Sequence, residues 1–425
     1  MITTIVSFII VFGILVFVHE FGHFIVAKKC GIMVREFSIG MGPKLFYYRR
    51  NHTTYTIRIL PLGGYVRLAG SVDDEADEIQ PGTPVKLQIN DNDLVTKIDL
   101  SNKNQMLKGI PFQVSDADLV NGLWIEGFEN GNENEKKRFS VDHDALIIKK
   151  DGIGVQIAPA DVQFQNAPVY KQIMVNAAGI INNVILAIVA FTILAFMQGG
   201  VSNNSNQIDI PNNQPSVAKD AGIKSGDRII AIDGHKTNTF QDIGKQIEKK
   251  PDQKIKIKVL HDKKDKNVTL KTASQQVQKK KVGIIGIKAT TNDSFGAKIT
   301  SGFTKTWSTT VQLAGALWSM VSGHFSLNNL GGPVAIYAST SQATSYGITG
   351  VVALLAWLSI NLAVVNLIPI PALDGGKIFL NVIQAIRGKP ISEKTETVIT
   401  LIGFGFLVIL MILVTWNDIM RYFVH

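Results

Sequence analysis

The sequence is poor in cysteine and in charge. Cys30 is the single cysteine among 425 residues, which excludes an intrachain disulfide bond. Charged residues make up only 18% of the chain, and the mean hydropathy of +0.17 is high for a soluble protein. The apolar residues are concentrated in a few long runs, a pattern typical of a membrane protein that carries extramembrane modules.

The N-terminal segment, residues 1–18, lacks charged side chains entirely. It looks like a signal peptide, but it has no basic start and no small-residue cleavage site, and cleavage near its end would destroy the motif that follows. We therefore expect residues 1–28 to form a first transmembrane helix that is retained in the protein.

This apolar segment contains the motif His19-Glu20-Phe21-Gly22-His23. On a helix, His19 and His23 are one turn apart and share a face, so both imidazoles can bind one metal ion. Glu20 lies about 100° round the helix, where its carboxylate can reach a metal-bound water. The motif could also be the polar surface of a soluble helix, but ionisable groups in a membrane-length segment are costly and usually functional. The pattern indicates a zinc hydrolase with two histidine ligands and a third ligand elsewhere.

The basic residues that flank the apolar runs predict the topology. Lys28 and Lys29 end the first run, and the positive-inside rule makes this flank cytoplasmic. An amphipathic segment at 300–345 could contain a short span, which would put Asp374 on the opposite leaflet from His19 and His23. We expect this segment to lie on the membrane surface instead. Further transmembrane helices are expected at residues 173–198, 349–376 and 397–416. Four spans place both termini outside the cytoplasm and the histidine motif toward the cytoplasmic side.

The segment between the first two helices reads as β-rich. Residues 33–70 alternate and are punctuated by glycines, which predicts either a β-hairpin that enters the membrane with its backbone covered or an ordinary cytoplasmic β-unit. An exposed edge could bind an unwound substrate as an added strand. Residues 71–168 are expected to form a cytoplasmic β-rich insert, acidic at 73–78. His143 stands between two aspartates, which could suggest a metal site, but we expect a solvated turn there.

The second helix and the module after it suggest packing and binding. The helix carries amides and a small residue that favour close helix packing or face a polar cavity: Asn176, Gly179, Asn182 and Asn183. Residues 205–290 combine short β-runs with Gly-Asp and Asp-Gly turns. They resemble an extracytoplasmic PDZ domain, a β-rich module that captures extended peptides.

Net charge is +9, and much of the excess lies in a lysine-rich patch at 249–281. We interpret this patch as a solvated face near an anionic membrane. We expect no nucleic-acid partner, because no aromatic interleaving or recognition motif accompanies the lysines.

The third helix provides a candidate for the missing ligand. Residues 368–376 read Ile-Pro-Ile-Pro-Ala-Leu-Asp-Gly-Gly, and two prolines there kink a helix. Asp374 therefore lies at a break at membrane depth, where a lone carboxylate would be costly. We expect Zn²⁺ to be held by His19, His23 and Asp374, with Glu20 as the catalytic base.

A substrate helix must unwind before its peptide bonds can be cut. Asn361 and Asn366 of the third helix could hold the freed backbone groups, or they could form interhelical hydrogen bonds instead.

These motifs together resemble the site-2 protease family of intramembrane zinc metalloproteases, in particular its RseP/RasP-type (Eep-like) bacterial branch, over nearly the whole chain. The histidine motif and the segment around Asp374 are the most specific part. The resemblance also covers residues 61–66, the PDZ-like module and residues 330–334. One departure is Ala178-Gly179-Ile180, where relatives commonly have Gly-Pro.

The resemblance implies a polytopic α-helical membrane protein with four transmembrane helices, a membrane-associated β-hairpin and one PDZ-like domain, in a bacterial cell membrane. It implies zinc ligands at His19, His23 and Asp374, catalysis by Glu20, and substrate contacts at Asn361. Further substrate contacts are expected at Asn366, Gly63, Gly64 and Tyr65. The expected substrates are single-span membrane proteins already cut by another protease, such as anti-sigma factors, and signal-peptide remnants.

Two alternatives stay open at this point. The chain could be a non-catalytic membrane PDZ adaptor that keeps the motif for structure. It could also be a membrane-anchored zinc protease of soluble proteins, which predicts a third ligand in an extramembrane helix.

Overall fold

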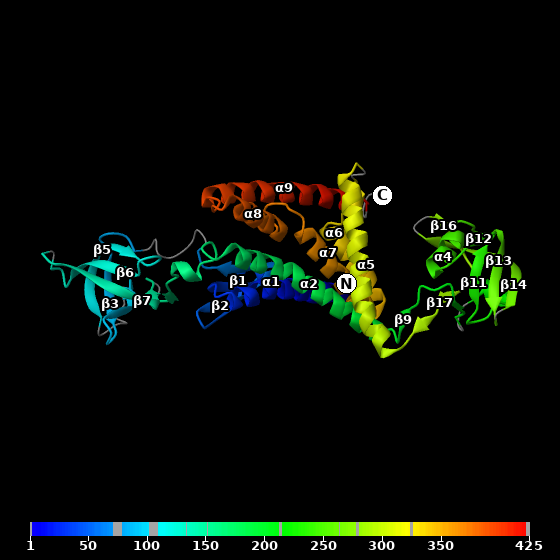
Figure 1. Cartoon of the computed structure of the whole chain (residues 1–425), viewed down its shortest axis with the longest axis horizontal. Coiled ribbons are helices and arrows are strands. Elements are labelled where there is room, and N and C mark those ends of the chain that lie inside the picture. Colours follow the sequence, from blue (N-terminus) through cyan, green and yellow to red (C-terminus); the bar gives the residue numbers. More distant parts are fainter. Residues whose placement is uncertain are drawn as a thin grey trace. The chain divides into compact units, whose positions relative to one another are not determined.

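A computed structural model of the chain describes residues 2–70, 79–101, 109–132, 134–150, 152–211, 215–262, 264–277, 280–323 and 326–421 (Figure 1). The acidic residues at 73–78 and part of the lysine-rich patch, residues 263 and 278–279, lie outside the described residues. The chain divides into two compact units, Met1–Ile188 with Thr306–His425, and Val189–Lys305.

Four helices of the described chain are long and apolar enough to cross a membrane. They are α1 (Ile2–Lys29), α2 (Val169–Met197), α7 (Gly347–Asn366) and α9 (Glu393–Ile419). Their apolar side chains cover most of each helix surface, as in helices that face lipid. The helices match the expected apolar runs in position, and a membrane protein is compatible with them. The number of crossings and their orientation stay predictions.

Helices α1 and α2 run side by side in Figure 1, and they pack backbone to backbone. A Cβ atom at Gly22 would lie 2.5 Å from the carbonyl oxygen of Ala178, closer than any side chain could approach. Small residues allow this contact between helices. Val11 and Leu15 of α1 pack instead with Leu354 and Leu358 of α7, so α1 contacts both α2 and α7.

The expected hairpin forms a small sheet of two bent strands, β1 (Val34–Arg50) and β2 (Thr53–Leu68). Both strands bend, so each contributes two segments to the sheet. The four segments, called rows below, lie side by side in the order 64–68, 34–39, 54–57 and 44–50. On one face, Phe37 packs edge-on against Phe17 and Phe24 of α1, with ring centroids 6.0 and 5.3 Å apart. The sheet is therefore attached to the helix that carries the histidine motif.

The insert forms a closed β-structure. Its strands are β3 (Pro84–Ile89), β4 (Leu94–Asp99), β5 (Ile110–Asp118), β6 (Trp124–Glu129), β7 (Lys136–Ile148) and β8 (Gly154–Gln156). The sheet order is β4-β3-β5-β6-β7-β8, and a parallel pairing of β4 with β7 closes five of the strands into a ring. Inward-facing residues such as Leu87, Ile98 and Ile125 fill it. The short 3₁₀ helix η2 (Ala160–Val162) then leads into α2.

From Phe295 onward, the described chain consists of helices with short connections and one longer break. Helix α5 (Phe295–Val321) is followed by η3 (Leu327–Asn329), α6 (Pro333–Ser345) and α7. Helix α7 ends at Asn366, and α8 (Asp374–Arg387) begins only after a break that holds Pro369 and Pro371. The helix expected at 349–376 is thus divided. The surface segment expected at 300–345 is two helices, and its place on a membrane stays a prediction.

The second unit has an isoleucine-rich core. Its four-stranded sheet has the order β12-β11-β13-β14. In β13, alternate residues Ile255, Ile257 and Val259 are buried, the pattern of a strand with one covered face. The helices are α3 (Val217–Asp220) and α4 (Phe240–Glu248). The four strands are β11 (Arg228–Ile232), β12 (His235–Lys236), β13 (Lys254–His261) and β14 (Lys264–Lys271).

The remaining strands of this unit form two-stranded sheets. They are β9 (Val201–Ser202), β10 (Ile208–Asp209), β15 (Ala273–Val277), β16 (Lys280–Ile284), β17 (Lys288–Ala289) and β18 (Thr291–Asn292). The unit is β-rich as expected, and its likeness to a PDZ domain stays a prediction.

Candidate metal centre

The two histidines of α1 face the same point. Their Nε2 atoms lie 3.4 Å apart, and each side chain is only 12% exposed. This follows from the four-residue spacing, since side chains four apart lie above one another on a helix.

Asp374 reaches the histidines from the first turn of α8. Its Oδ2 atom lies 3.3 Å from Nε2 of His19 and 3.3 Å from Nε2 of His23. The same oxygen is buried and accepts no hydrogen bond. The structure therefore brings the three expected ligands, separated by about 350 residues of sequence, to one point.

Two glycines after Asp374 make this approach possible. A Cβ atom at Gly375 would lie 2.4 Å from the carbonyl oxygen of Leu367, and one at Gly376 would lie 2.2 Å from that of Ile370. The first turn of α8 thus packs directly on the backbone of the break. Ala372 in the break has φ of 85°, a conformation that non-glycine residues rarely adopt. The Asp-Gly-Gly sequence is needed because no side chain fits between the break and the helix.

The three donor atoms fit zinc. They form a triangle with sides of 3.3, 3.3 and 3.4 Å. In a tetrahedral site with zinc–ligand distances of about 2.0–2.1 Å, neighbouring ligand atoms lie roughly 3.3–3.4 Å apart. Among the described residues, these three form the one group of histidine, cysteine and carboxylate side chains close enough to share a metal ion.

Helix α2 orients both imidazoles. Nδ1 of His23 donates to the carbonyl oxygen of Val175 at 2.7 Å, which leaves the Nε2 lone pair for a metal. Nδ1 of His19 lies 3.1 Å from the amide of Asn183. The amide oxygen of Asn183 is otherwise buried without a partner, so turning that amide by 180° lets it accept the Nδ1 proton of His19. Both rings are then held in the tautomer that a metal ligand needs.

Gly179 of α2 sits against the two rings. A Cβ atom there would lie 2.3 Å from Nε2 of His23 and 2.6 Å from Cε1 of His19. Helix α2 can therefore approach the imidazoles only because residue 179 has no side chain. The sequence showed Gly179 and Asn183 as packing residues, and their helical spacing from Val175 places all three on the face toward α1.

A buried amide network fastens α8 to α2. The side-chain amide of Asn176 donates to Asn381 at 2.8 Å, and the amide of Asn381 donates to Gln172 at 2.5 Å. All three side chains are at most 7% exposed. Asn381 lies seven residues after Asp374, on the same face of α8. Sequence reasoning missed Asn381, although this two-turn spacing from Asp374 was a signal for it.

The backbone of β2 lies against Glu20. A Cβ atom at Gly64 would come within 3.0 Å of Cγ of Glu20 and 2.8 Å of Val16. Gly63 has φ of 80°, which favours glycine. The hydroxyl of Tyr65 accepts a hydrogen bond from Arg58 at 2.6 Å, away from the metal ligands. Of the three expected hairpin residues, the structure thus brings Gly64 close to the histidine motif.

The two asparagines of α7 are not joined to the three ligands. The amide of Asn361 donates to the carbonyl oxygen of Trp357 in its own helix, at 3.4 Å. Asn366, at the end of α7, is 8% exposed. Their role toward a substrate stays a prediction.

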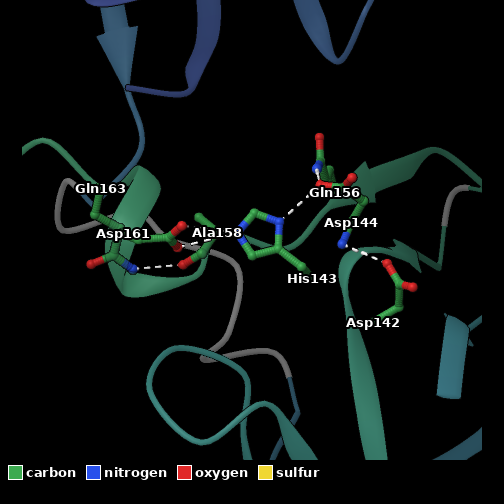
Figure 2. A network of polar contacts seen from close by, with 7 residues as sticks. All are labelled: Asp142, His143, Asp144, Gln156, Ala158, Asp161 and Gln163. Atoms are coloured by element: carbon green, nitrogen blue, oxygen red, sulfur yellow. Dashed lines mark hydrogen bonds and ion pairs between the residues drawn. The ribbon is translucent and has the colours of Figure 1, made fainter. Parts of the chain in front are cut away.

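A second histidine–carboxylate cluster lies in the insert, and Figure 2 shows it. His143 contacts Asp144 through Nδ1 at 3.0 Å and Asp161 through Nε2 at 3.1 Å. The prediction of a turn at His143 is wrong, because this residue lies within strand β7. The pairing of β7 with β4 is irregular at this point. His143 is nonetheless half-exposed. The hydrogen bond with Asp144, with help from Asp161, raises the pKa of His143 above its ordinary value.

Comparisons with known proteins agree with this centre. The family model described as "Peptidase family M50" matches residues 7–410. "Probable protease eep" of Enterococcus faecalis is 48% identical over 424 residues, which cover 99% of this chain and 99% of that protein. "Putative zinc metalloprotease LL2128" of Lactococcus lactis is 43% identical over 439 residues and covers all of both chains.

Solved structures are less similar. An HtrA-type protease with a bound decapeptide covers 51% of this chain and 64% of its own, at 15% identity and a TM-score of 0.14. A TM-score this low carries no information on the fold.

Proposed function

Since the chain belongs to peptidase family M50, a family of zinc-dependent metalloproteases, we propose that it is an intramembrane endopeptidase. It cleaves single-span membrane proteins at a site built from His19, His23, Asp374 and Glu20. The observation that carries the proposal is the 3.3–3.4 Å triangle of donor atoms. Two of its corners lie in the apolar helix α1, and the third starts the helix that follows apolar α7.

Zinc held by the three side chains supplies Lewis acidity, which polarises a carbonyl and acidifies water near neutral pH. The carboxylate of Glu20 accepts the proton of the attacking water and gives it to the leaving amine nitrogen. Nδ1 of His23 and Nδ1 of His19 stay bound to α2, so the Nε2 atoms remain directed at the ligand site.

The substrate is an unwound segment that lies along β2. Residues 64–68 form an outer row of the hairpin sheet, and among the described residues they pair with β1 on one side. An extended peptide can add to such an edge by backbone hydrogen bonds. Since a Cβ atom at Gly64 would lie 3.0 Å from Cγ of Glu20, a strand added beside Gly63, Gly64 and Tyr65 passes close to the catalytic carboxylate. Asn361 and Asn366 are proposed to hold freed backbone groups further along.

The biological setting follows from the same proposal. The protein spans a bacterial cell membrane four times, with both termini and the β-rich module at residues 205–290 outside and the metal centre toward the cytoplasm. That module is a PDZ-like gate that admits only substrates shortened by an earlier cleavage. Anti-sigma factors and signal-peptide remnants are substrates of this kind.

Two further readings are weaker. A non-catalytic adaptor does not explain why the donor triangle has zinc dimensions. A protease of soluble proteins does not explain why the ligands lie in and beside apolar helices, since an open aqueous site needs no such placement.

The deciding experiment uses the purified full chain in lipid vesicles with a synthetic signal-peptide remnant. Wild type is expected to cut the peptide inside its apolar segment, while Glu20→Gln retains zinc and loses cleavage by at least about a hundredfold. Glu248→Gln, on the surface of α4, is the matched control. Unchanged cleavage by Glu20→Gln would exclude the proposed catalytic role. Cleavage of casein but not of the membrane peptide would instead identify a protease of soluble proteins.

A further inference from the structure

The hairpin sheet and the insert line a basic pocket that is open to solvent and contains none of the three candidate metal ligands. Its volume is about 270 Å³. Among the residues that the structure describes, five cationic side chains line it, against the single carboxylate of Glu36. The five are Arg35, Lys44, Arg49, Arg67 and Lys149. Such an excess of one charge in a concave site attracts an anion.

The strand register explains how the cations come together. Glu36 pairs with Arg67 on one side and with Thr54 on the other, and Thr54 pairs with Arg49. These four residues therefore form one line across the four rows of the sheet, on the same face. The insert closes the pocket from the other side, where Arg35 donates to the backbone oxygen of Gln156 in β8.

The one carboxylate of the pocket is already engaged. Oε1 of Glu36 accepts hydrogen bonds from Thr56 at 2.7 Å and from Arg58 at 3.0 Å. Arg58 is not among the residues that line the pocket. Glu36 is thus neutralised from within the sheet, so its carboxylate does not cancel the positive charge of Lys44, Arg49 and Arg67 in the lining.

The opposite face of the same sheet packs on α1 through Phe37, and it carries exposed apolar side chains in the rows 54–57 and 44–50. Phe46, Tyr48 and Ile57 are 60%, 54% and 48% exposed. Because side chains alternate along a strand, Phe46 and Tyr48 face away from their neighbours Tyr47 and Arg49, which line the pocket. A strand with exposed aromatic residues on one face and cations on the other is typical of a membrane–water interface.

We propose that this basic pocket binds the phosphate group of an anionic phospholipid, at a membrane surface that also covers Phe46, Tyr48 and Ile57. Basic pockets at the membrane surface commonly take lipid headgroups. An acidic protein segment would satisfy the charges but leave the apolar face uncovered, whereas a lipid surface accounts for both. The bound lipid fixes the depth of the hairpin sheet relative to the membrane, and with it the position of Gly64 beside α1. The proposal requires a membrane-embedded chain and does not depend on the proposed substrate.

The test titrates phosphatidylglycerol into the full chain in neutral detergent micelles and counts bound lipids by native mass spectrometry. Phosphatidylcholine with the same acyl chains is the reference lipid. Wild type is expected to prefer phosphatidylglycerol. Lys44→Gln with Arg49→Gln is expected to weaken phosphatidylglycerol binding about tenfold, since each cation near an anionic lipid contributes severalfold. Its affinity for phosphatidylcholine is expected to stay unchanged.

The matched control removes the same charge elsewhere. Lys254→Gln with Lys256→Gln changes two exposed lysines of β13 and is expected to leave both affinities unchanged. If the Lys44/Arg49 double variant does not fold, Arg49→Gln and the charge-retaining Arg49→Lys replace it, and only Arg49→Gln is expected to lose affinity.

Several results would overturn the proposal. One is equal binding of the two lipids by wild type, and another is equal loss in the β13 control, which would indicate unspecific charge attraction. Inorganic phosphate that displaces the lipid at comparable concentration would assign the pocket to a free anion. Tighter binding of a polyglutamate peptide would assign it to an acidic protein segment.

Discussion

Two clusters of the first unit contain the same kinds of side chain and differ in everything around them. His19, His23 and Asp374 are 11–12% exposed, whereas His143, Asp144 and Asp161 are 45–72% exposed. In the first cluster, one carboxylate oxygen faces two imidazoles whose other nitrogens are held by α2. In the second, one imidazole uses both nitrogens on two solvated carboxylates. Residue type alone therefore does not make a metal site. The arrangement around the imidazoles does, because it decides which lone pairs remain free and converge.

Asp374→Asn is expected to have the largest effect. The amide is a far weaker zinc ligand than the carboxylate, so zinc affinity should fall more than about a hundredfold. This exceeds the loss typical of changing a residue that only hydrogen-bonds to a ligand. Zinc per chain is measured by elemental mass spectrometry after dialysis against a chelator. Asp161→Asn in the exposed cluster is the control and should retain full zinc. Equal zinc loss in both variants would remove the distinction between the clusters.

Gly179→Ala is expected to have the second largest effect on zinc binding. The new Cβ would lie 2.3 Å from Nε2 of His23, so the imidazoles or α2 must move, and zinc affinity should fall about 10- to 100-fold. Chelator competition measures the change. Gly13→Ala, at a position of α1 with no atom within 4 Å of the new Cβ, should behave as wild type. If both alanine variants bind zinc normally, the close approach of α2 is not required.

Asn381→Leu tests whether the amide network positions Asp374. The change leaves the amides of Asn176 and Gln172 without their buried partner, at a cost of about 1–3 kcal/mol. Zinc affinity should fall about tenfold, because α8 is no longer fastened to α2. The melting temperature of the zinc-loaded chain should drop more than that of the zinc-free chain. Asn361→Leu is the control, and equal drops in both forms would indicate a purely structural role.

His143→Asn should have the smallest effect. Its carboxylate partners raise the pKa of His143 in the folded protein. The stabilisation is therefore complete below the unfolded value of about 6.5 and is lost as the pH rises through the raised pKa. For an exposed cluster it should amount to less than about 1 kcal/mol. Thermal unfolding of wild type and variant should differ at about pH 5.5 and converge at alkaline pH. A difference in thermal stability that does not change with pH would contradict the raised pKa of His143.

The three candidate metal ligands could be selected from the sequence because each carries a local signal. His19 and His23 have helical spacing, and Asp374 is an ionisable residue in an apolar stretch next to two prolines. The break between α7 and α8 was also predictable, since prolines cannot continue a helix. The length of the break was not predictable, because the end of α7 at Asn366 depends on how the break packs against Gly375 and Gly376.

The partners of the ligands could not be predicted in the same way. The carbonyl oxygen of Val175 has no signature in any sequence, and Asn183 and Asn381 look like ordinary polar residues of apolar helices. Only the packing of α2 between α1 and α8 gives them a role. The basic pocket is similar, since its cations are scattered between Arg35 and Lys149. They meet only through the register of the four rows and the packing of the insert against the sheet.

By itself, the sequence determined the chemistry of the centre, because residue type decides what can bind zinc and helical periodicity decides what shares a face. The tertiary structure decided the geometry. The distances between Asp374 and the histidines, the tautomers of the two rings and the contact of Gly64 with Glu20 all depend on contacts between segments that are far apart in the chain. Such contacts arise from packing, and no local pattern encodes them.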